Sequence, residues 1–305
     1  MRNLLRANFS RLFKSKIFYL AVLAMAGLAA FTTWNQWDDM RKYGVIATVD
    51  YALFLIQVVF GIVAAIFVSL FVGVEYSDGT IRNKLLVGRK RTDIYLANFI
   101  TCGVALAVVY AVSTAVALGL GTLLLEASAV PAKHLWIAFG MGFFPVLAYT
   151  AIYNFIAMLL SNRTYTAIAA ILLAFGLMIC ATYVQNRLDQ PEFIQQLAHT
   201  AAASDVVEEQ VEIDAHTENV ETAVAVGEDG EISQMELETV PNPQYLAGAE
   251  RERFQFFFDV NPSGQTIELA MLNIPHPVRV VLLDFGIMAV FCLGGVLLFQ
   301  KKDIK

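Results

Sequence analysis

Six long apolar runs constrain the fold of this chain more than any other feature of its sequence. Each run approaches or exceeds the roughly 20 residues that an α-helix needs to cross a bilayer core of about 30 Å. The runs cover approximately residues 17–34, 52–74, 94–125, 135–160, 165–184 and 278–299. We therefore predict an all-α polytopic membrane protein with six transmembrane helices.

The composition of the whole chain agrees with a membrane protein. Hydrophobic residues make up 57% of the 305 residues and charged residues 16%, whereas a soluble domain has about 45–50% apolar and about 25% charged residues. The three cysteines, Cys102, Cys180 and Cys292, all lie inside apolar runs. They therefore predict neither a disulfide framework nor a cysteine-based metal site.

Two of the runs are expected to deviate from a straight, bilayer-matched helix. The run 94–125 is long enough to tilt or to protrude from the bilayer. Pro145 lies inside the fourth run, where its missing N–H predicts a kink, and neighbouring helices can satisfy the freed carbonyl.

The amino-terminal segment is predicted to remain in the protein and to begin with an amphipathic helix. Five of the first sixteen residues are basic, and the run 17–34 lacks a small-residue cleavage site. Ahead of that run, helical spacing places Leu5, Phe9, Leu12 and Phe13 on one face, which is typical of an elbow helix at the cytoplasmic lipid surface. The alternative is a plain basic flank that only sets the orientation.

The distribution of lysine and arginine predicts which loops face the cytoplasm. Fourteen of the 21 basic residues lie in the amino-terminal segment, in the loops after the second and fourth runs, and in the carboxy-terminal tail. Both termini are therefore expected in the cytoplasm, because cytoplasmic loops carry the excess of positive charge. The segment 185–277 is then extracellular.

This 93-residue extracellular segment is acidic, with 18 carboxylates against three arginines. Residues 204–239 alternate acidic and β-branched residues around a Gly-Glu-Asp-Gly turn, which predicts a hairpin of two strands. The stretches PEFIQQLAHTAAA, AERERFQFFF and NPSGQTIELAML have helical spacing. We expect a small mixed α/β domain whose charge either keeps it soluble or attracts cationic molecules.

The loop between the second and third runs carries the densest positive charge of the chain. Five cations lie within ten residues, namely Arg82, Lys84, Arg89, Lys90 and Arg91. The topology rule alone could account for them. However, Gly79 predicts a sharp turn, Asp78 or Thr80 could cap a following helix, and Ile81, Leu85 and Leu86 would share one face of it. Such a short cationic helix suits docking onto a soluble cytoplasmic protein.

At these residues the sequence resembles a known family. E-Y-S-D-G-T-I-R-N-K, residues 75–84, is similar to the E-Y-x-x-G-T-x-[RK] segment of ABC-2-type permeases. N-L-L-R-A-N-F-S-R-L-F-K-S-K (3–16) resembles their elbow helix. P-N-P-Q-Y-L-A-G (241–248), N-P-S-G-Q-T-I (261–267) and the ending F-Q-K-K-D-I-K (299–305) resemble segments of a Gram-positive bacterial branch.

The resemblance implies a permease subunit of an ABC exporter in the bacterial plasma membrane. It would pair with a second copy or a paralogue and bind separate ATPase subunits that hold ATP and Mg²⁺. The sequence contains no G-x-x-x-x-G-K-[ST] phosphate loop, so ATPase activity would reside in that partner chain. The family's coupling helix corresponds to the loop 75–93, and its expected coupling residues here are Glu75, Tyr76, Gly79, Thr80, Arg82 and Lys84.

Physical roles for some of these residues follow as hypotheses. Glu75 would pair with a basic group near the elbow helix, whereas Arg82 and Lys84 would meet acidic groups of the ATPase. The substrate would be a hydrophobic or amphipathic peptide, lipid or drug, moved outward. Candidate residues of the substrate path are Asp284, Asn98 and Asn154. Asp284 could instead reach the interface or pair with Arg279, and the two asparagines could simply bond between helices.

Two other classes of function fit the sequence less well. A secondary transporter would carry inverted repeats and charged groups at the membrane midplane, which the sequence lacks. A membrane enzyme would need a histidine or paired-acid cluster at membrane depth; the four histidines lie in predicted loops without metal-ligand spacing. An immunity or sensor protein on the same fold, which removes or detects an antimicrobial peptide, remains the alternative function.

The predicted organisation therefore has three parts. Residues 1–184 form the elbow helix and transmembrane helices one to five, with the coupling loop 75–93. Residues 185–277 form the acidic extracellular domain. Residues 278–305 form transmembrane helix six and a cytoplasmic tail.

Overall fold

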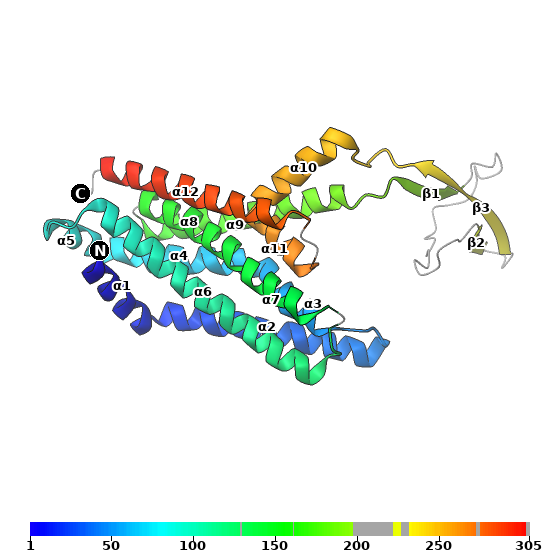
Figure 1. Cartoon of the computed structure of the whole chain (residues 1–305), viewed down its shortest axis with the longest axis horizontal. Helices are drawn as coiled ribbons and strands as arrows, with labels where there is room; N and C mark the ends of the chain where they lie inside the picture. Colours follow the sequence, from blue (N-terminus) through cyan, green and yellow to red (C-terminus); the bar gives the residue numbers. More distant parts are fainter. Residues whose placement is uncertain (129, 161, 198–221, 227–231, 273–274, 303–305) are drawn as a thin grey trace. The chain divides into compact units, whose positions relative to one another are not determined.

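The computed structural model of the chain describes residues 1–128, 130–160, 162–197, 222–226, 232–272 and 275–302. The chain divides into two compact units, one made of Met1–Val184 with Gln255–Lys305 and the other of Gln185–Phe254. The first unit is a helical bundle, and the second carries a small sheet (Figure 1). The stretch from 255 to 277, predicted as part of the extracellular segment, belongs to the helical unit.

The described residues contain six stretches of helix long and apolar enough to cross a membrane, which confirms the predicted polytopic fold. Four of these spans are single helices, and two are composite. They are α2 (Lys16–Tyr43), α3 (Val49–Leu55) with η1 (Ile56–Val59) and α4 (Phe60–Ser77), α6 (Arg91–Leu124), α7 (Ala132–Met141) with α8 (Phe143–Leu160), α9 (Arg163–Leu188) and α12 (Pro277–Lys301).

The composite spans are interrupted for different reasons. The break between α7 and α8 falls at Gly142, and Pro145 lies in the first turn of α8, so the predicted kink is confirmed. A Cβ atom at Gly142 would collide with the ring and hydroxyl of Tyr110, so glycine permits this close crossing. The 3₁₀ turn η1 in the second span was not predicted, because its residues are as apolar as those of the helices beside it.

Buried tyrosines hold the bundle together by hydrogen bonds from one helix to another. The hydroxyl of Tyr95 on α6 donates to the carbonyl of Phe291 on α12 at 3.0 Å. The hydroxyl of Tyr110, also on α6, donates to the carbonyl of Phe139 on α7 at 2.9 Å. Each ring fills the apolar core while its hydroxyl finds an acceptor at the far side, which is why tyrosine suits these positions.

The predicted elbow helix is present as α1 (Arg2–Lys14). Its buried face consists of Leu4, Asn8 and Leu12, with Leu5 and Phe9 packed partly against the core. Of the predicted apolar face, only Phe13 is exposed. That face therefore serves the protein's own core more than the lipid surface that the sequence predicted for it.

The short helix α11 (Pro262–Ala270) is inserted among the spans, and every one of its residues is buried. Asn261 caps it, because the side-chain oxygen accepts from the Ser263 N–H at 2.9 Å while Pro262 occupies the first helical position. The Asn261 amide also donates to the carbonyl of Leu177 on α9 at 2.8 Å. The N-P-S-G sequence therefore starts α11 and ties it to the bundle, and its predicted helical character is confirmed.

The second unit holds a three-stranded antiparallel sheet with the strand order β1-β3-β2. The strands β2 (Thr222–Val226) and β3 (Ile232–Pro241) pair as the predicted hairpin, although the turn 227–231 and the stretch 198–221 lie outside the described residues. The helix α10 (Gly248–Val260), which begins in this unit, contains the predicted helical stretch AERERFQFFF.

The helix predicted for PEFIQQLAHTAAA was wrong over its described part, where residues Phe193–Leu197 form the strand β1. All five residues of β1 pair with the long strand β3, and this ladder satisfies their backbone groups. Pairing with a neighbouring strand thus outweighs the helical spacing of a short segment.

Candidate functional site

The candidate site lies at the end of the bundle that carries the amino terminus, the end of α12 and the short helix α5 (Thr80–Leu86), which we call the α5 end (Figure 1). Helix α4 ends at Ser77, and Gly79 reverses the chain in the left-handed conformation with φ of 65°. The Thr80 hydroxyl donates to the carbonyl of Glu75 at 2.9 Å. The predicted side-chain cap by Asp78 or Thr80 was wrong, because Gly79 itself starts α5 and the Thr80 hydroxyl instead satisfies the end of α4.

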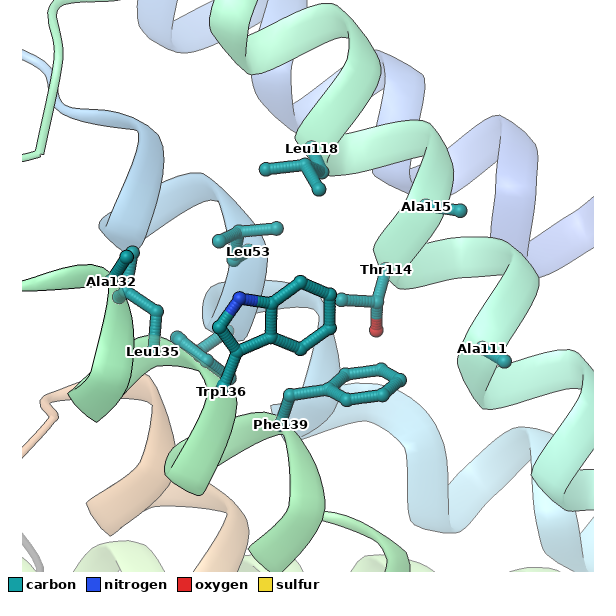
Figure 2. A pocket seen from close by; sticks show the side chains of 10 residues that line it. Leu53, Ala111, Thr114, Ala115, Leu118, Ala132, Leu135, Trp136 and Phe139 are labelled. Carbon is teal, nitrogen blue, oxygen red and sulfur yellow. The ribbon is translucent and has the colours of Figure 1, made fainter.

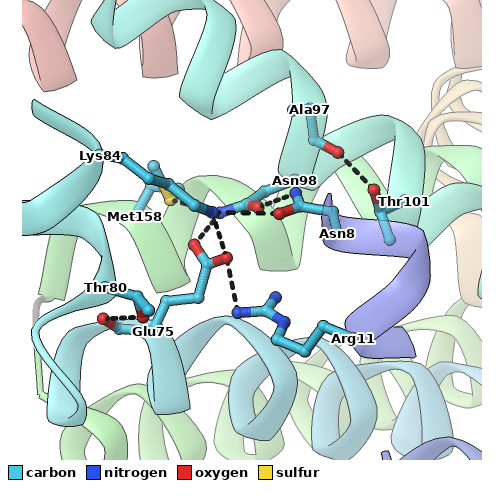
Figure 3. Close-up of polar contacts among 9 residues, drawn as sticks. All are labelled: Asn8, Arg11, Glu75, Thr80, Lys84, Ala97, Asn98, Thr101 and Met158. Atoms are coloured by element: carbon cyan, nitrogen blue, oxygen red, sulfur yellow. Dashed lines mark hydrogen bonds and ion pairs between the residues drawn. The ribbon is translucent and has the colours of Figure 1, made fainter. Parts of the chain in front are cut away.

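Glu75 is fully buried in the last turns of α4 and is surrounded by donors (Figure 3). Its Oε1 atom lies 2.5 Å from Nη1 of Arg11 on α1 and 2.5 Å from Nζ of Lys84 on α5. Its Oε2 atom accepts from Nδ2 of Asn98 on α6 at 2.8 Å. An ionised carboxylate is costly to bury unless it is paired and hydrogen-bonded, and here the three partners come from three different helices.

Asn8 completes this group, which we call the Glu75 cluster: Glu75, Arg11, Lys84, Asn98 and Asn8. The Asn8 amide donates to Oδ1 of Asn98 at 2.7 Å, and its oxygen accepts from Nζ of Lys84 at 3.1 Å. The guanidinium of Arg11 lies 4.1 Å from the centre of the Phe71 ring, which adds a cation–π contact. The cluster thus links α1, α4, α5 and α6 through charge-assisted bonds.

We call the segment between α4 and α6, which contains α5, the α5 loop. A second group of hydrogen bonds holds the start of this loop against α8 and the carboxy-terminal end. The Tyr76 hydroxyl donates to the carbonyl of Met158 at 2.6 Å. Nζ of Lys302 donates to the carbonyls of Met158 at 2.8 Å and Leu159 at 2.6 Å. A cation at these carbonyls complements the negative end of α8. Burial lowers the pKa of Lys302 from its usual value to about 8.

A third group of hydrogen bonds holds the end of the α5 loop against the end of α12. Nη1 of Arg91, the first residue of α6, donates to the carbonyl of Phe299 at 2.9 Å and also contacts the carbonyls of Gln300 and Lys302. These carbonyls lie at the end of α12, so a cation stabilises them as Lys302 stabilises the end of α8. Both ends of the α5 loop are therefore bonded to the ends of other spans.

The outer face of α5 is exposed. Arg82 and Asn83 lie on it, and the apolar side chains of Leu86 and Val87 are 77% and 75% exposed. Ile81 is buried and holds α5 against the bundle. The chain thus presents two large apolar side chains beside an arginine at the tip of a rigidly held turn.

The structure distributes the predicted coupling residues between the two faces of this turn. Glu75, Tyr76, Thr80 and Lys84 are bonded within the bundle, and Gly79 forms the turn between α4 and α5; only Arg82 of the predicted set is exposed. The ammonium group of Lys84 is bonded to Glu75 and Asn8 inside the bundle, partners that the sequence analysis did not predict; its contact with the ATPase stays a prediction.

Sequence reasoning also missed partners in the cluster. For Asn98, the predicted alternative of a hydrogen bond between helices is confirmed, because its amide on α6 donates to Glu75 on α4; the prediction did not name Glu75 as the partner. It predicted a basic partner for Glu75 near the elbow helix without identifying Arg11, and it assigned no role to Asn8. The spacing of Leu4, Asn8, Arg11 and Leu12 along α1 was the available signal for the inward face of that helix.

The opposite end of the bundle, where α7 begins and α11 lies, holds the candidate Asp284; we call it the α7 end. Asp284 on α12 is fully buried, and neither carboxylate oxygen has a hydrogen-bond partner among the described residues. It neither reaches the surface nor pairs with Arg279, whose Nε lies 3.1 Å from Oδ2 of Asp259. Both of these alternatives for Asp284 were therefore wrong. Asn154, on α8, is also fully buried.

A second carboxylate lies close to the Asp259–Arg279 pair. Gln255 donates to Oδ1 of Asp259 at 2.8 Å and to Oε1 of Glu268 at 2.9 Å, so one amide bridges two acids. Burial, helped by the charge of Asp259, raises the pKa of Glu268 to about 7, although Gln255 and Arg279 act in the opposite direction. Among the described residues no group of three or more His, Cys, Asp or Glu side chains is placed to hold a metal ion.

The fold defines the class of the protein, and comparison with known proteins then gives its family. Six membrane-crossing helices with the helical turn α5 held at one end of the bundle make it a multi-pass membrane protein. The family description "ABC-2 family transporter protein" matches residues 4–181, more than half of the chain, and the chain belongs to this family. That range includes the Glu75 cluster and α5. No match was found among the curated proteins.

Replacing Glu75 tests whether the cluster holds the α5 end together. Glu75→Gln keeps the shape of the side chain but leaves Arg11 and Lys84 without their counter-charge. We expect a loss of about 2–4 kcal/mol in the free energy of unfolding, measured by thermal unfolding of the purified protein.

The matched control is Asp38→Asn, which breaks the exposed pair between Asp38 and Lys42. Because water screens that pair, the melting temperature should stay close to that of the wild type. Equal stability of the Glu75→Gln and Asp38→Asn variants would contradict a structural role for the cluster.

The raised pKa of Glu268 predicts a pH dependence of stability. Its carboxyl group holds a proton more firmly in the folded chain than in the unfolded chain, where its pKa is near 4.5. Stability should therefore fall as the pH rises from about 4.5 to about 7, and then level off. Thermal unfolding of the wild type and of Glu268→Gln across this range measures the effect.

The variant isolates this residue from other titrating groups. Glu268→Gln keeps an oxygen to accept from Gln255 but cannot ionise, so the difference in melting temperature between the two proteins should grow with pH. A difference that is constant across the range would show that Glu268 does not titrate there.

Proposed function

We propose that this chain is the membrane subunit of an ATP-driven exporter and that a separate ATPase chain binds ATP and Mg²⁺. The observation that carries the proposal is the way α5 is held. The Glu75 cluster fixes its inner face, while Leu86 and Val87 remain exposed on the outer face. Exposed apolar side chains on a rigid support are typical of an anchor that fits a cleft in a partner protein.

The hydrogen bonds and ion pairs around α5 could transmit a movement of that partner to the membrane-crossing helices. A displacement of α5 would act on α1 and α6 through the Glu75 cluster, on α8 through Tyr76, and on α12 through Arg91. Breaking a buried ion pair leaves an uncompensated charge, so these helices would move with α5 rather than separate from it. ATP-driven motion of the partner would thereby change the packing of the spans.

The same end of the bundle supports the proposed orientation. The α5 end carries the amino terminus, the end of α12 and the basic loop between α4 and α6, and an excess of positive charge favours the cytoplasmic side. An ATPase that uses cellular ATP must also meet the chain on that side. The protein would then lie in a bacterial cell membrane with both termini in the cytoplasm and with residues 185–277 outside.

The proposed substrate is a hydrophobic or amphipathic molecule that moves outward. The spans α9 and α12 leave most of their apolar surface exposed in the single chain, and a second copy or a paralogue could cover part of it. A path between two such subunits would be apolar. Asp284 and Asn154 are buried in the single chain and would reach a substrate only if the packing opened.

Changing the exposed face of α5 tests the proposed docking. Leu86→Glu and Arg82→Glu leave the Glu75 cluster intact but place a carboxylate in the contact with the ATPase. Copurification with the ATPase chain should weaken by about tenfold or more for Leu86→Glu, because a few anchor positions dominate such contacts. ATP hydrolysis and substrate export by the complex in liposomes should fall with it.

The matched control is Arg6→Glu, a charge reversal at an exposed position of α1 at the same end of the bundle. It should leave copurification and ATP hydrolysis unchanged. If both α5 variants bind the ATPase and export at wild-type levels, the loop serves only the topology of the chain.

A further inference from the structure

An apolar pocket opens at the α7 end, between α3, α6 and α7, with a cavity volume of about 270 Å³ (Figure 2). Its buried floor includes Leu53, Phe54 and Thr114. Its exposed rim includes Leu118 and Trp136. All of its lining residues belong to the helical unit.

The floor of the pocket offers a ligand only hydrocarbon contacts. The hydroxyl of Thr114 donates to the carbonyl of Tyr110 at 2.9 Å and accepts from the Gln57 amide at 3.3 Å, so its hydrogen bonds are made within the protein. The other polar side-chain atom of the lining is the indole nitrogen of Trp136, which belongs to the rim. The volume is slightly below the roughly 300–1,000 Å³ typical of sites for whole drug-sized ligands, so it suits part of a molecule such as one alkyl chain.

The rim lies at a depth where the surrounding solvent is lipid. Leu118 and Ala115 come before the end of α6 at Leu124 by distances of about 9 and about 14 Å along the helix. A bilayer core is about 30 Å thick, so these positions belong to the leaflet at the α7 end. Trp136, near the start of α7, is of the residue type that favours the membrane interface.

A cation lies beside the same wall of the pocket. Ala132 lines the pocket, and the next residue, Lys133, is exposed at the start of α7. Lys133 makes no ion pair within the described part of the chain. A phosphate at headgroup level would complement this charge while a chain attached to it entered the pocket.

We propose that this pocket binds one acyl chain of a phospholipid from the leaflet at the α7 end, with the lipid phosphate near Lys133. The wall formed by α7 joins α8 at Gly142, where Tyr110 crosses, so a bound chain would contact the segment next to this break in the fourth span. Under the orientation proposed above this is the outer leaflet. Binding itself depends on neither ATP hydrolysis nor export.

Photolabelling of the purified full-length chain in lipid nanodiscs tests the site. The nanodiscs contain phosphatidylglycerol and phosphatidylethanolamine with a small fraction of phosphatidylglycerol that carries a diazirine midway along one acyl chain. Mass spectrometry should place the label on peptides that contain Ala115 and the α7 residues Leu135 and Trp136. A probe with its diazirine on the headgroup should not label Ala115.

Variants distinguish the pocket from the general lipid-facing surface. Ala115→Phe and the milder Ala111→Leu fill the pocket from α6 and should reduce labelling of the α7 peptide by about tenfold and by a smaller factor, respectively. The matched control is Val108→Phe, about two turns before Ala115 on α6, exposed and outside the lining. It should leave the labelling unchanged. Lys133→Ala should weaken labelling by the phosphatidylglycerol probe.

Three outcomes would overturn the proposal. Equal labelling of the wild type, Ala115→Phe and Ala111→Leu would show that the chains do not enter the pocket. Labelling spread evenly over all lipid-facing helices would show ordinary solvation. Displacement of the label by excess free fatty acid but not by excess unlabelled phosphatidylglycerol would assign the pocket to a different ligand. None of these outcomes bears on docking of the ATPase.

Discussion

The buried charge of Glu75 is the interaction on which the arrangement of the α5 end depends. A carboxylate in this position must be compensated, and the chain supplies a guanidinium from α1, an ammonium group from α5 and an amide from α6. Removing any one partner leaves a buried group less well satisfied, so the four helices are held in one relative position. The outer face of α5 is rigid because its inner face is fixed in this way.

The two ends of the bundle use polar groups differently. At the α5 end, cations cap the last carbonyls of α8 and α12 and neutralise Glu75. At the α7 end, Asp259 pairs with Arg279 and shares one amide with Glu268, while Asp284 has no hydrogen-bond partner among the described residues. The first arrangement favours a fixed structure. The second arrangement leaves buried acids with fewer compensating partners than Glu75 has.

Much of the fold could be predicted because the bilayer imposes it. A run of about 20 apolar residues has few alternatives to a membrane-crossing helix, and Pro145 marks a bend by its chemistry. The 3₁₀ turn η1 and the strand β1 were not predicted, because packing against other elements decides them. Local sequence carries little of that information.

The position of the candidate site could be predicted from the sequence, but its individual hydrogen bonds could not. Which amino-terminal cation contacts Glu75 depends on how α1 packs against α6, and the helical spacing of the sequence does not give the rotation of α1 about its axis. The same reason explains why the sequence did not identify Glu75 as the partner of Lys84 and of Asn98.

The most direct measurement of the central claim is the distance between α1 and α5 during the ATPase cycle. Spin labels at Asn3 and Asn83, both exposed, can be introduced after replacement of the three native cysteines. Pulsed electron paramagnetic resonance on the complex with its ATPase should give the same distance distribution without nucleotide and with ATP trapped, because the Glu75 cluster moves as one body. A shift of that distribution on trapping ATP would show that α5 moves independently of α1 and would contradict the proposed coupling.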